Sequence, residues 1–307
     1  MSRYNPTLTW KEIMTLTFKR AMEEKKKRVE ECLRNCIKHE QGVPGIIYEA
    51  MEYSLFAGGK RLRPILVMAG CELCGGDVSR VMPLACAVEL IHSYSLIHDD
   101  LPAMDNDDYR RGKPTSHRVF GDGLAVLAGD GLLNYAFEVM LDLCPLEGGN
   151  LKAVKEIARA AGVTGMIGGQ VMDLQFEGKR PDLDELKEMH LRKTGALICA
   201  SLLAGALSAG CSDAEYENIQ RFGKNLGLAF QIRDDILDVI GKEETMGKRV
   251  GSDASKKKST YVSVLGLEES TRLVKKLIDE AKDSLAAFGE KAEFLIKLAD
   301  SLIDRES

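Results

Sequence analysis

Apolar residues recur every three or four positions along most of the chain, the spacing that gathers them on one face of an α-helix. Two such series are Leu151, Val154, Ile157, Ala158 and Ala161, and Leu186, Met189, His190, Leu197 and Ile198. The strict alternation of apolar and polar residues that is typical of half-buried strands is scarce. The pattern therefore predicts an all-α protein with about ten or more helices.

Helix boundary signals agree with this interpretation. The segment Pro181–Glu185 places acidic residues where the exposed amides and the dipole of a helix N-terminus favour them. Glycine pairs, the first at Gly58–Gly59, fall between the periodic segments as turns do. Nothing between Val43 and Glu269 has the Pro/Ser-rich composition of a linker, so we expect residues 1–307 to form a single domain.

One segment is apolar enough to bear on membranes. Thr194–Ser212 is uncharged for about the length that spans a bilayer. Its Gly, Ala and Ser content favours a helix packed closely inside a bundle instead. The N-terminus has no basic region followed by an apolar run. We expect no membrane span and no signal peptide.

The composition adds limits on partners and location. The formal net charge is −5, whereas a nucleic-acid-binding surface normally makes a domain basic, so we expect no nucleic-acid partner. Most cysteines lie in apolar stretches, as around Cys86 and Cys199, which is typical of buried reduced thiols in a cytoplasmic protein. Cys71 and Cys74 form a CxxC pair, but no second Cys/His pair follows at zinc spacing.

Two acidic clusters carry the first chemical signal. Asp234 and Asp238 are four positions apart, on one face of a helix with apolar neighbours, so their carboxylates need a cation to compensate them. Asp99 and Asp105 are six apart and would diverge on a regular helix, but Pro102 breaks the helix between them. The chain can then bulge and bring both carboxylates together. Oxygen ligands without a His/Cys cluster indicate Mg²⁺.

Basic residues supply the other half of the signal. Arg110, Arg111 and Lys113 follow the first acidic cluster, and the segment Gly58–Pro64 reads GGKRLRP. Guanidinium and ammonium groups bind oxyanions, and acids, a metal and arginines together are the composition of a diphosphate site. The chain has no P-loop, no GxGxxG and no GxSxG sequence.

These motifs together resemble a known family. DDLPAMD from Asp99 with RRGKPT after it, GGKRLRP from Gly58, HLRKTGAL from His190 and FQIRDDILD from Phe230 are similar to the motifs of the trans-prenyltransferases, the bacterial farnesyl/geranylgeranyl diphosphate synthases. The resemblance implies the isoprenoid synthase fold, a large helical bundle around a central apolar cavity, and a homodimer. It also implies that the two acidic motifs face each other across that cavity.

The resemblance further implies a reaction and its residues. Mg²⁺, three ions in number and replaceable by Mn²⁺, would bridge the carboxylates to an allylic diphosphate, which ionises and is attacked by isopentenyl diphosphate. The expected metal ligands are Asp99, Asp105 and Asp234, with Asp100 and Asp238 in support. The expected isopentenyl diphosphate ligands are Lys60, Arg63, His92 and Arg111. The expected allylic diphosphate ligands are Arg110, Lys193, Lys248 and Lys258. Thr194 and Gln231 are expected near the developing cation.

The resemblance implies that product length depends on the residues just before the first acidic motif. Tyr94, five positions before Asp99, would form the floor of the cavity, while Ser95 beside it is small. An aromatic floor with the insertion in DDLPAMD resembles the farnesyl-forming pattern, so (2E,6E)-farnesyl diphosphate from dimethylallyl and geranyl starters is the expected product. Geranylgeranyl diphosphate synthases share the insertion and remain an alternative.

Three other functions stay open at this point. A terpene cyclase would share the fold, but such enzymes generally lack the second acidic motif and GGKRLRP. A non-catalytic partner subunit would be expected to have lost some of the acids. A metal-dependent phosphohydrolase would need more histidines around His98-Asp99 than a chain with five histidines provides.

Overall fold

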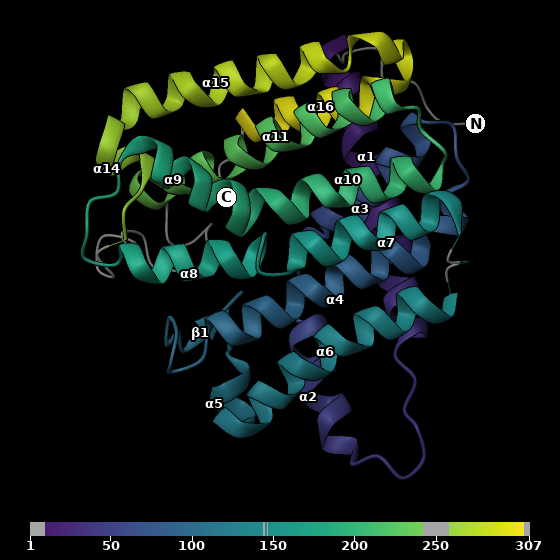
Figure 1. Ribbon diagram of the computed structural model, residues 1–307, viewed down its shortest axis with the longest axis vertical. Coiled ribbons are helices and arrows are strands. Elements are labelled where there is room, and N and C mark those ends of the chain that lie inside the picture. Colours follow the sequence, from purple (N-terminus) through teal and green to yellow (C-terminus); the bar gives the residue numbers. More distant parts are fainter. Residues whose placement is uncertain (1–9, 144, 146, 242–257, 304–307) are drawn as a thin grey trace.

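The computed structural model describes residues 10–143, 145, 147–241 and 258–303. Helices make up most of them, so the predicted all-α architecture is confirmed (Figure 1). The first helices are α1 (Trp10–Cys36), α2 (Gly45–Leu55), α3 (Leu62–Leu73), η1 (Val78–Val81), α4 (Met82–Asp99), α5 (Ser116–Phe120), α6 (Asp122–Leu143) and α7 (Gly148–Ala161). The later ones are α8 (Met166–Phe176), α9 (Leu183–His190), η2 (Leu191–Gly195), α10 (Ala196–Ser208), α11 (Asp213–Ile240), α14 (Tyr261–Leu265), α15 (Leu267–Ser284), η3 (Ala286–Ala292) and α16 (Glu293–Ile303).

The core of the bundle is built around α10 and α4. Helix α10 packs against α3, α7 and α11, and α4 packs against α3 and α6, while α15 lies along α11 at the top of Figure 1. All residues from Leu197 to Leu207 are buried, which confirms that this apolar segment is a core helix. The approach to α3 is close, because a Cβ at Gly205 would lie 1.9 Å from the carbonyl oxygen of Val67.

Three stretches of the described chain are long and apolar enough to cross a bilayer, judged by length and composition only. They are Val78–Asp99, Asp122–Asp142 and Leu183–Ser208. The first and third have 67% of their most apolar window buried inside the bundle, so packing accounts for their apolar character. The second, in α6, has only 39% buried, and its Leu127 and Leu141 side chains are more than half exposed. Helix α6 therefore presents an apolar face that the bundle does not cover.

Local sequence explains where the elements near the site begin and end. Helix α9 starts with a capping box, in which the Asp182 side chain accepts from the Glu185 amide and the Glu185 side chain accepts from the Asp182 amide. Helices α9 and α10 are then joined by a π-helical turn at Leu191–Gly195. Such turns occur often at functional sites.

A short hairpin follows α4. Strands β1 (Tyr109–Arg110) and β2 (Lys113–Pro114) pair in antiparallel fashion, and no other strand is present in the described part of the chain. The turn between them places Arg111 in the left-handed region, with φ at 53°. This conformation is uncommon for a residue with a side chain. The hairpin brings Arg110 and Arg111 back over the end of α4.

Candidate active site

The C-terminal end of α4 folds back on itself. The Asp105 amide donates to the Asp99 carbonyl at 2.8 Å, and the Met104 amide donates to the Leu101 carbonyl at 2.9 Å. This is the turn predicted from Pro102. Burial and the nearby Asp105 carboxylate raise the pKa of Asp99, while Lys193 and other bases oppose the shift. Two carboxylates that destabilise each other's charge in a buried place favour a bound cation.

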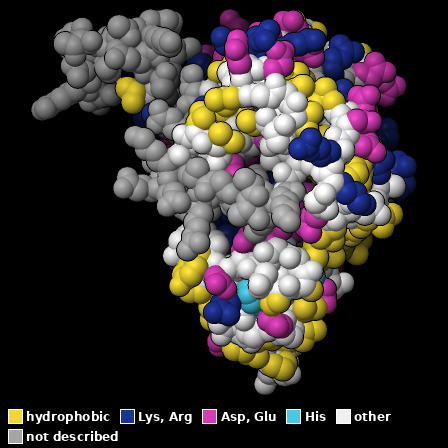
Figure 2. All heavy atoms as spheres, turned by 90° about the vertical axis from the view of Figure 1, so that its left-hand side faces the viewer, with side chains coloured by type: hydrophobic (Ala, Val, Ile, Leu, Met, Phe, Trp, Pro, Cys, Tyr) yellow, Lys and Arg dark blue, Asp and Glu magenta, His cyan; other side chains and the backbone are white. Residues whose placement is uncertain are grey.

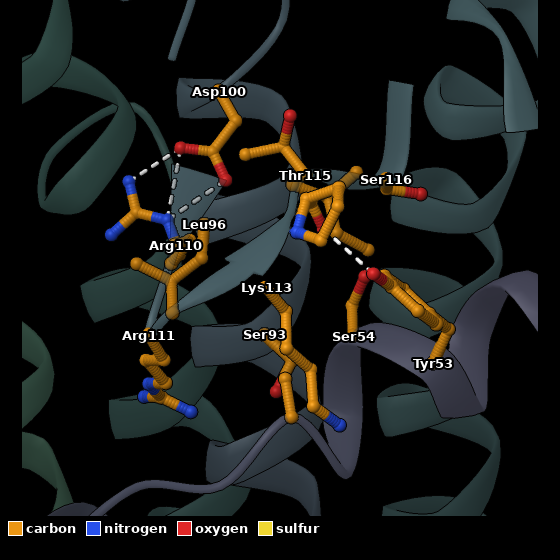
Figure 3. Close-up of a pocket in the computed structure, with 13 residues that line it drawn as sticks. Tyr53, Ser54, Ser93, Leu96, Asp100, Arg110, Arg111, Lys113, Thr115 and Ser116 are labelled. Carbon is orange, nitrogen blue, oxygen red and sulfur yellow. Dashed lines mark hydrogen bonds and ion pairs between the residues drawn. The ribbon is translucent and has the colours of Figure 1, made fainter. Parts of the chain in front are cut away.

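Asp100 makes a different contact from its neighbour. It is 3% exposed, and its two carboxylate oxygens lie 2.9 and 2.8 Å from the Arg110 Nε, as Figure 3 shows. A two-pronged ion pair of this kind fixes the guanidinium in one orientation. Burial raises the pKa of Asp100, and the hydrogen bonds from Arg110 oppose that shift. Asp100 therefore positions Arg110 in this structure.

Three predicted isopentenyl diphosphate ligands, Arg63, His92 and Arg111, gather beside Arg110. Arg111 donates to the Gly58 carbonyl, and a Cβ at Gly59 would lie 2.7 Å from the Arg111 guanidinium, so the two loops touch only because residue 59 has no side chain. Burial and the adjacent charges of Arg63 and Arg111 lower the pKa of His92 well below its usual value. Arg63, His92 and Arg111 thus form one basic group, and Lys60 lies on the same loop as Gly59.

Arg63 and Arg61 behave differently although they are two residues apart. Burial lowers the pKa of Arg63 to about 10, and the negative charges of Glu89 and Asp234 oppose that shift. The Nε atoms of Arg63 and Arg61 both lack a hydrogen-bond partner among the described residues. Arg61 instead points into the bundle, where it donates to Glu89 at 2.8 Å and to the Leu55 carbonyl at 2.8 Å. Arg61 is therefore a structural residue.

One acidic residue near these groups was not predicted from the sequence. Asp173 on α8 pairs with Lys193 at 2.6 Å and lies 3.6 Å from Lys258, which itself donates to Asp105 at 2.9 Å. Burial raises the pKa of Asp173, but both lysines outweigh it and the net shift is downward. A signal was available, because Asp173 is the only charged residue of α8. Gly169 allows this contact, since a Cβ there would lie 2.2 Å from the Lys193 amide nitrogen.

Thr194 and Gln231, both predicted near the developing cation, are in contact. The Thr194 hydroxyl donates to the Gln231 carbonyl at 2.8 Å, and the Gln231 amide donates to Asp235 at 3.1 Å. Asp235 also accepts from the Tyr261 amide at 2.9 Å, which ties this chain of hydrogen bonds to the start of α14. The network fixes which end of the Gln231 side chain faces Thr194.

The carboxylates fit a hard cation that brings its own further ligands. On α11, Asp238 is 2% exposed and Asp234 is partly buried, and the charge of Asp234 acts on Arg63 across the site. Among the residues that the structure describes, no three His, Cys, Asp or Glu side chains come close enough to hold a metal alone. Mg²⁺ suits such a site because it keeps waters and binds substrate phosphates alongside one or two carboxylates.

The remaining predicted residues lie as follows. Tyr94 is 6% exposed, and burial together with the charge of Asp99 raises the pKa of its hydroxyl to about 12. The Ser95 hydroxyl donates to the His92 carbonyl at 2.9 Å. Lys248 lies outside the described residues.

Two pockets border these residues. One lies between α2, α4 and the hairpin, and Figure 3 shows Asp100, Arg110 and Arg111 on its wall. The other is lined by residues that include Asp173, Lys193, Gln231 and Lys258. Figure 2 shows acidic side chains in the middle of the face where α4 ends. The deep apolar cavity between the acidic motifs is neither of these two pockets and stays a prediction.

Comparisons with known proteins agree on one family. Residues 44–294 match the polyprenyl synthetase family. The chain is 47% identical to a geranylgeranyl diphosphate synthase of Cyanophora paradoxa, over 92% of this chain and 95% of that protein. It is 45% identical to a farnesyl diphosphate synthase of Geobacillus stearothermophilus, over 93% of each. A crystal structure of a Helicobacter pylori geranyltransferase complexed with magnesium and isoprenyl diphosphate superposes with a TM-score of 0.82 at 32% identity, covering 99% of this chain and 98% of that one.

Proposed function

The chain belongs to the polyprenyl synthetase family and is a short-chain prenyltransferase, and we propose that its product is (2E,6E)-farnesyl diphosphate. In this proposal it joins isopentenyl diphosphate head-to-tail to dimethylallyl and then geranyl diphosphate. The buried Tyr94 carries the proposal of a fifteen-carbon product. It lies on α4 five positions before Asp99, whose charge adds to burial in raising its pKa, and in the proposal its ring meets the growing tail there.

We propose that Mg²⁺ is held by the carboxylates of both acidic motifs. Asp99 and Asp105 would bind it from the end of α4, and Asp234 and Asp238 from α11. The raised pKa of Asp99 supports this assignment, since its charged form lacks full compensation from the protein. When bound, Mg²⁺ would supply positive charge for the departing diphosphate.

The basic residues have separate tasks in the proposal. Arg110, oriented by Asp100, and Lys193 at the π-helical turn bind the allylic diphosphate together with Lys258. In the structure Lys193 pairs with Asp173 and Lys258 pairs with Asp105. Diphosphate oxygens can take over the same ammonium groups without moving the backbone.

Isopentenyl diphosphate occupies the second basic group. Lys60, Arg63, His92 and Arg111 bind its diphosphate in the proposal, and the closeness of three of these groups supports it, because the charges of Arg63 and Arg111 both lower the pKa of His92. The condensed product loses a proton at the end of the reaction. Thr194 and Gln231, held together by a hydrogen bond, present oxygen atoms toward the developing cation.

A geranylgeranyl product is the second candidate. The relative of Cyanophora paradoxa that is 47% identical carries that name, and Ser95 beside Tyr94 is small. If the growing tail passes on the Ser95 side, the Tyr94 ring does not stop it. The choice between fifteen and twenty carbons therefore depends on which of these two neighbours the tail meets.

We also propose a cytoplasmic homodimer. Helix α6 carries exposed apolar side chains at Val126, Leu127 and Leu141, and a second copy of the chain would cover them. The seven cysteines of the described segments are free thiols, which supports a reducing compartment. Sedimentation of the purified protein at several concentrations tests the dimer.

Product chromatography tests the function. The enzyme is incubated with Mg²⁺, isopentenyl diphosphate and, in separate reactions, the dimethylallyl, geranyl or farnesyl starter. A fifteen-carbon product from the two shorter starters, with farnesyl diphosphate left unextended, is expected. Extension of farnesyl diphosphate to twenty carbons would favour the second candidate. Absence of any condensation would contradict the prenyltransferase assignment.

A further inference from the structure

A group of three thiols lies away from the proposed site, between α1 and α4. The Cys86 Sγ on α4 is 3.1 Å from the Cys32 Sγ on α1, and it points its hydrogen toward Cys32. Cys36 follows one helical turn after Cys32 and also interacts with Cys86. A disulfide bond is about 2.05 Å long. The two sulfur atoms are therefore about 1 Å from bonding distance.

The two partners differ in their access to solvent. Cys86 is 0% exposed, whereas Cys32 and Cys36 are partly exposed at the surface of α1. Val29 and Leu33, both 0% exposed, hold this stretch of α1 against the bundle. A small oxidant can therefore reach Cys32, and the fixed packing keeps the buried Cys86 thiol beside it.

The local chemistry favours Cys32 as the sulfur that reacts first. The hydrogen bond from Cys86 lowers the pKa of Cys32 to about 7, although burial opposes this, and an interaction with Cys86 also lowers the pKa of Cys36. Cys32 differs by its 3.1 Å distance to the Cys86 sulfur. The CxxC pair behaves in the opposite way, since burial raises the pKa of Cys71 to about 11 and that of Cys74 to about 12. Reactive cysteines have accessible thiolates, and inert buried ones do not.

We propose that Cys32 and Cys86 form a reversible intramolecular disulfide when the folded protein meets a peroxide, and that this is a modification site joining α1 to α4. The peroxide oxidises the Cys32 thiolate to a sulfenic acid, and one water is released. The Cys86 sulfur then attacks the Cys32 sulfur, the S–O bond breaks, and the hydroxyl leaves as a second water with the Cys86 proton. Two electrons pass from the thiols to the peroxide, and a dithiol returns them.

The bond would fasten the N-terminal helix to the helix that carries His92, Tyr94 and Asp99. It would close a loop from residue 32 to residue 86, and cross-links that close long loops restrict the unfolded chain most in the entropic account. We expect the oxidised protein to unfold at a temperature higher by on the order of 5 °C than the reduced protein. A dithiol removes this difference.

Peptide mapping identifies the bond. Because Arg34 separates Cys32 from Cys36, trypsin releases them on different peptides, 29–34 and 35–38, while Cys86 lies on 81–110. The folded full-length protein is treated with hydrogen peroxide, blocked with N-ethylmaleimide at acid pH and digested without reduction. Peptide 29–34 is expected in covalent linkage to 81–110, with 35–38 carrying the maleimide. A linked pair of 29–34 and 35–38, or maleimide on both Cys32 and Cys86, would overturn the proposal.

Matched variants separate this bond from other oxidation. Cys32→Ser, at a partly exposed position, should abolish the linked peptide and the rise in unfolding temperature. Cys36→Ser and Cys71→Ser should keep both. A rise that persists in Cys32→Ser would contradict the assignment, as would a linked species that runs as a dimer on a non-reducing gel.

Discussion

Lys193 Nζ lies 2.6 Å from Asp173 Oδ2, and the same carboxylate lies 3.6 Å from Lys258. One acidic residue of α8 thus holds two cations that reach it from the π-helical turn and from the segment before α14. Like charges so close to each other need a shared counterion. The arrangement makes Asp173 a positioning residue for the proposed diphosphate site.

Replacing Asp173 tests this role. Asp173→Asn removes the shared counterion, so Lys193 should lose its partner, while Lys258 keeps Asp105 but loses its common orientation with Lys193. We expect kcat/KM for the allylic diphosphate to fall about 10-fold or more, largely through KM. Steady-state kinetics at several salt concentrations measure it. Asp184→Asn, at an exposed acid of α9, should leave kcat/KM unchanged, and an unchanged value in Asp173→Asn would show that the lysines need no counterion.

The aspartates of the two acidic motifs should be needed for Mg²⁺-dependent activity but not for folding. Asp99→Asn and Asp234→Asn are each expected to lower kcat by on the order of 10²- to 10³-fold, since each removes a charged oxygen ligand. Chelation of Mg²⁺ should abolish turnover of the unmodified enzyme. Calorimetry should show that both variants keep the folded state but lose the stabilisation given by Mg²⁺ with inorganic diphosphate. Asp213→Asn, at the exposed start of α11, provides the control.

Tyr94 should determine product length. Tyr94→Ala opens the space below Asp99 and is expected to shift the main product from fifteen to twenty or more carbons. Tyr94→Phe keeps the ring and should keep the fifteen-carbon product. Chromatography of the dephosphorylated alcohols measures the distribution. If Tyr94→Ala leaves the distribution as it was, the tail does not meet this ring.

His190 should make folding stability depend on pH. It is 5% exposed between Asp173, Lys193, Asp235 and Tyr261, and burial lowers its pKa to about 4, with Asp173 opposing and Lys193 adding to the shift. The unfolded chain binds the proton with a pKa of about 6.5. The contribution of His190 to the free energy of unfolding is therefore fully present above about pH 6.5. It falls as the pH drops toward 4, by about 3 kcal/mol in total.

Urea unfolding between pH 4 and pH 7 measures this dependence. In His190→Gln the free energy of unfolding should change less with pH over that range, because the unfolded variant has no proton to take up at this position. His39→Gln removes an exposed histidine on the other side of the bundle and should retain the wild-type pH dependence. If the free energy of unfolding changes equally with pH in wild type and His190→Gln, groups other than His190 cause the loss of stability at acid pH.

Arg61 and Glu89 form a buried pair whose loss should affect stability before activity. Arg61→Met leaves the Glu89 carboxylate, which is 2% exposed, without its main partner. Breaking one side of a buried ion pair costs about 3–5 kcal/mol. We expect the free energy of unfolding to drop by that amount, with the kcat of the remaining folded enzyme within about 3-fold of wild type. In Arg61→Met with Glu89→Leu, most of the loss should be recovered.

The sequence predicts those features of the site that neighbouring residues determine, and it does not predict those that depend on distant contacts. The fold-back of Asp105 onto Asp99 was predictable because Pro102 breaks the helix whatever surrounds it. The different roles of Arg61 and Arg63 were not, since both are arginines of one short motif and only the position of Glu89 distinguishes them. Asp173 was visible as a lone charge on an apolar helix, but the lysines that it binds come from distant segments.

The helices were predictable because their apolar spacing is a local property of the sequence. The π-helical turn at Leu191–Gly195 was not predictable. The burial of α10 followed from its Gly, Ala and Leu content, which needs no knowledge of its neighbours. The hairpin at Tyr109–Pro114 depends on contacts with α2 such as the hydrogen bond from Tyr53 to the Pro114 carbonyl at 2.8 Å. The apolar series from Leu186 to Ile198 keeps helical spacing through Leu191–Gly195 without a visible break. The π-helical turn inside it leaves no trace in that pattern.

The π-helical turn lets one helical segment do two things: bury the apolar side of α10 and direct Lys193 and Thr194 toward the proposed site. A π-helical turn contains one residue more than an α-helical turn. If the same residues Leu191–Gly195 were wound as a regular α-helix, the extra residue would rotate everything after it by about 100° relative to α9. Either the apolar side of α10 or the ends of Lys193 and Thr194 would then face the wrong way. The extra residue shifts the helical phase between α9 and α10. The apolar side chains of α10 can therefore face the core while Lys193 and Thr194 face the proposed site.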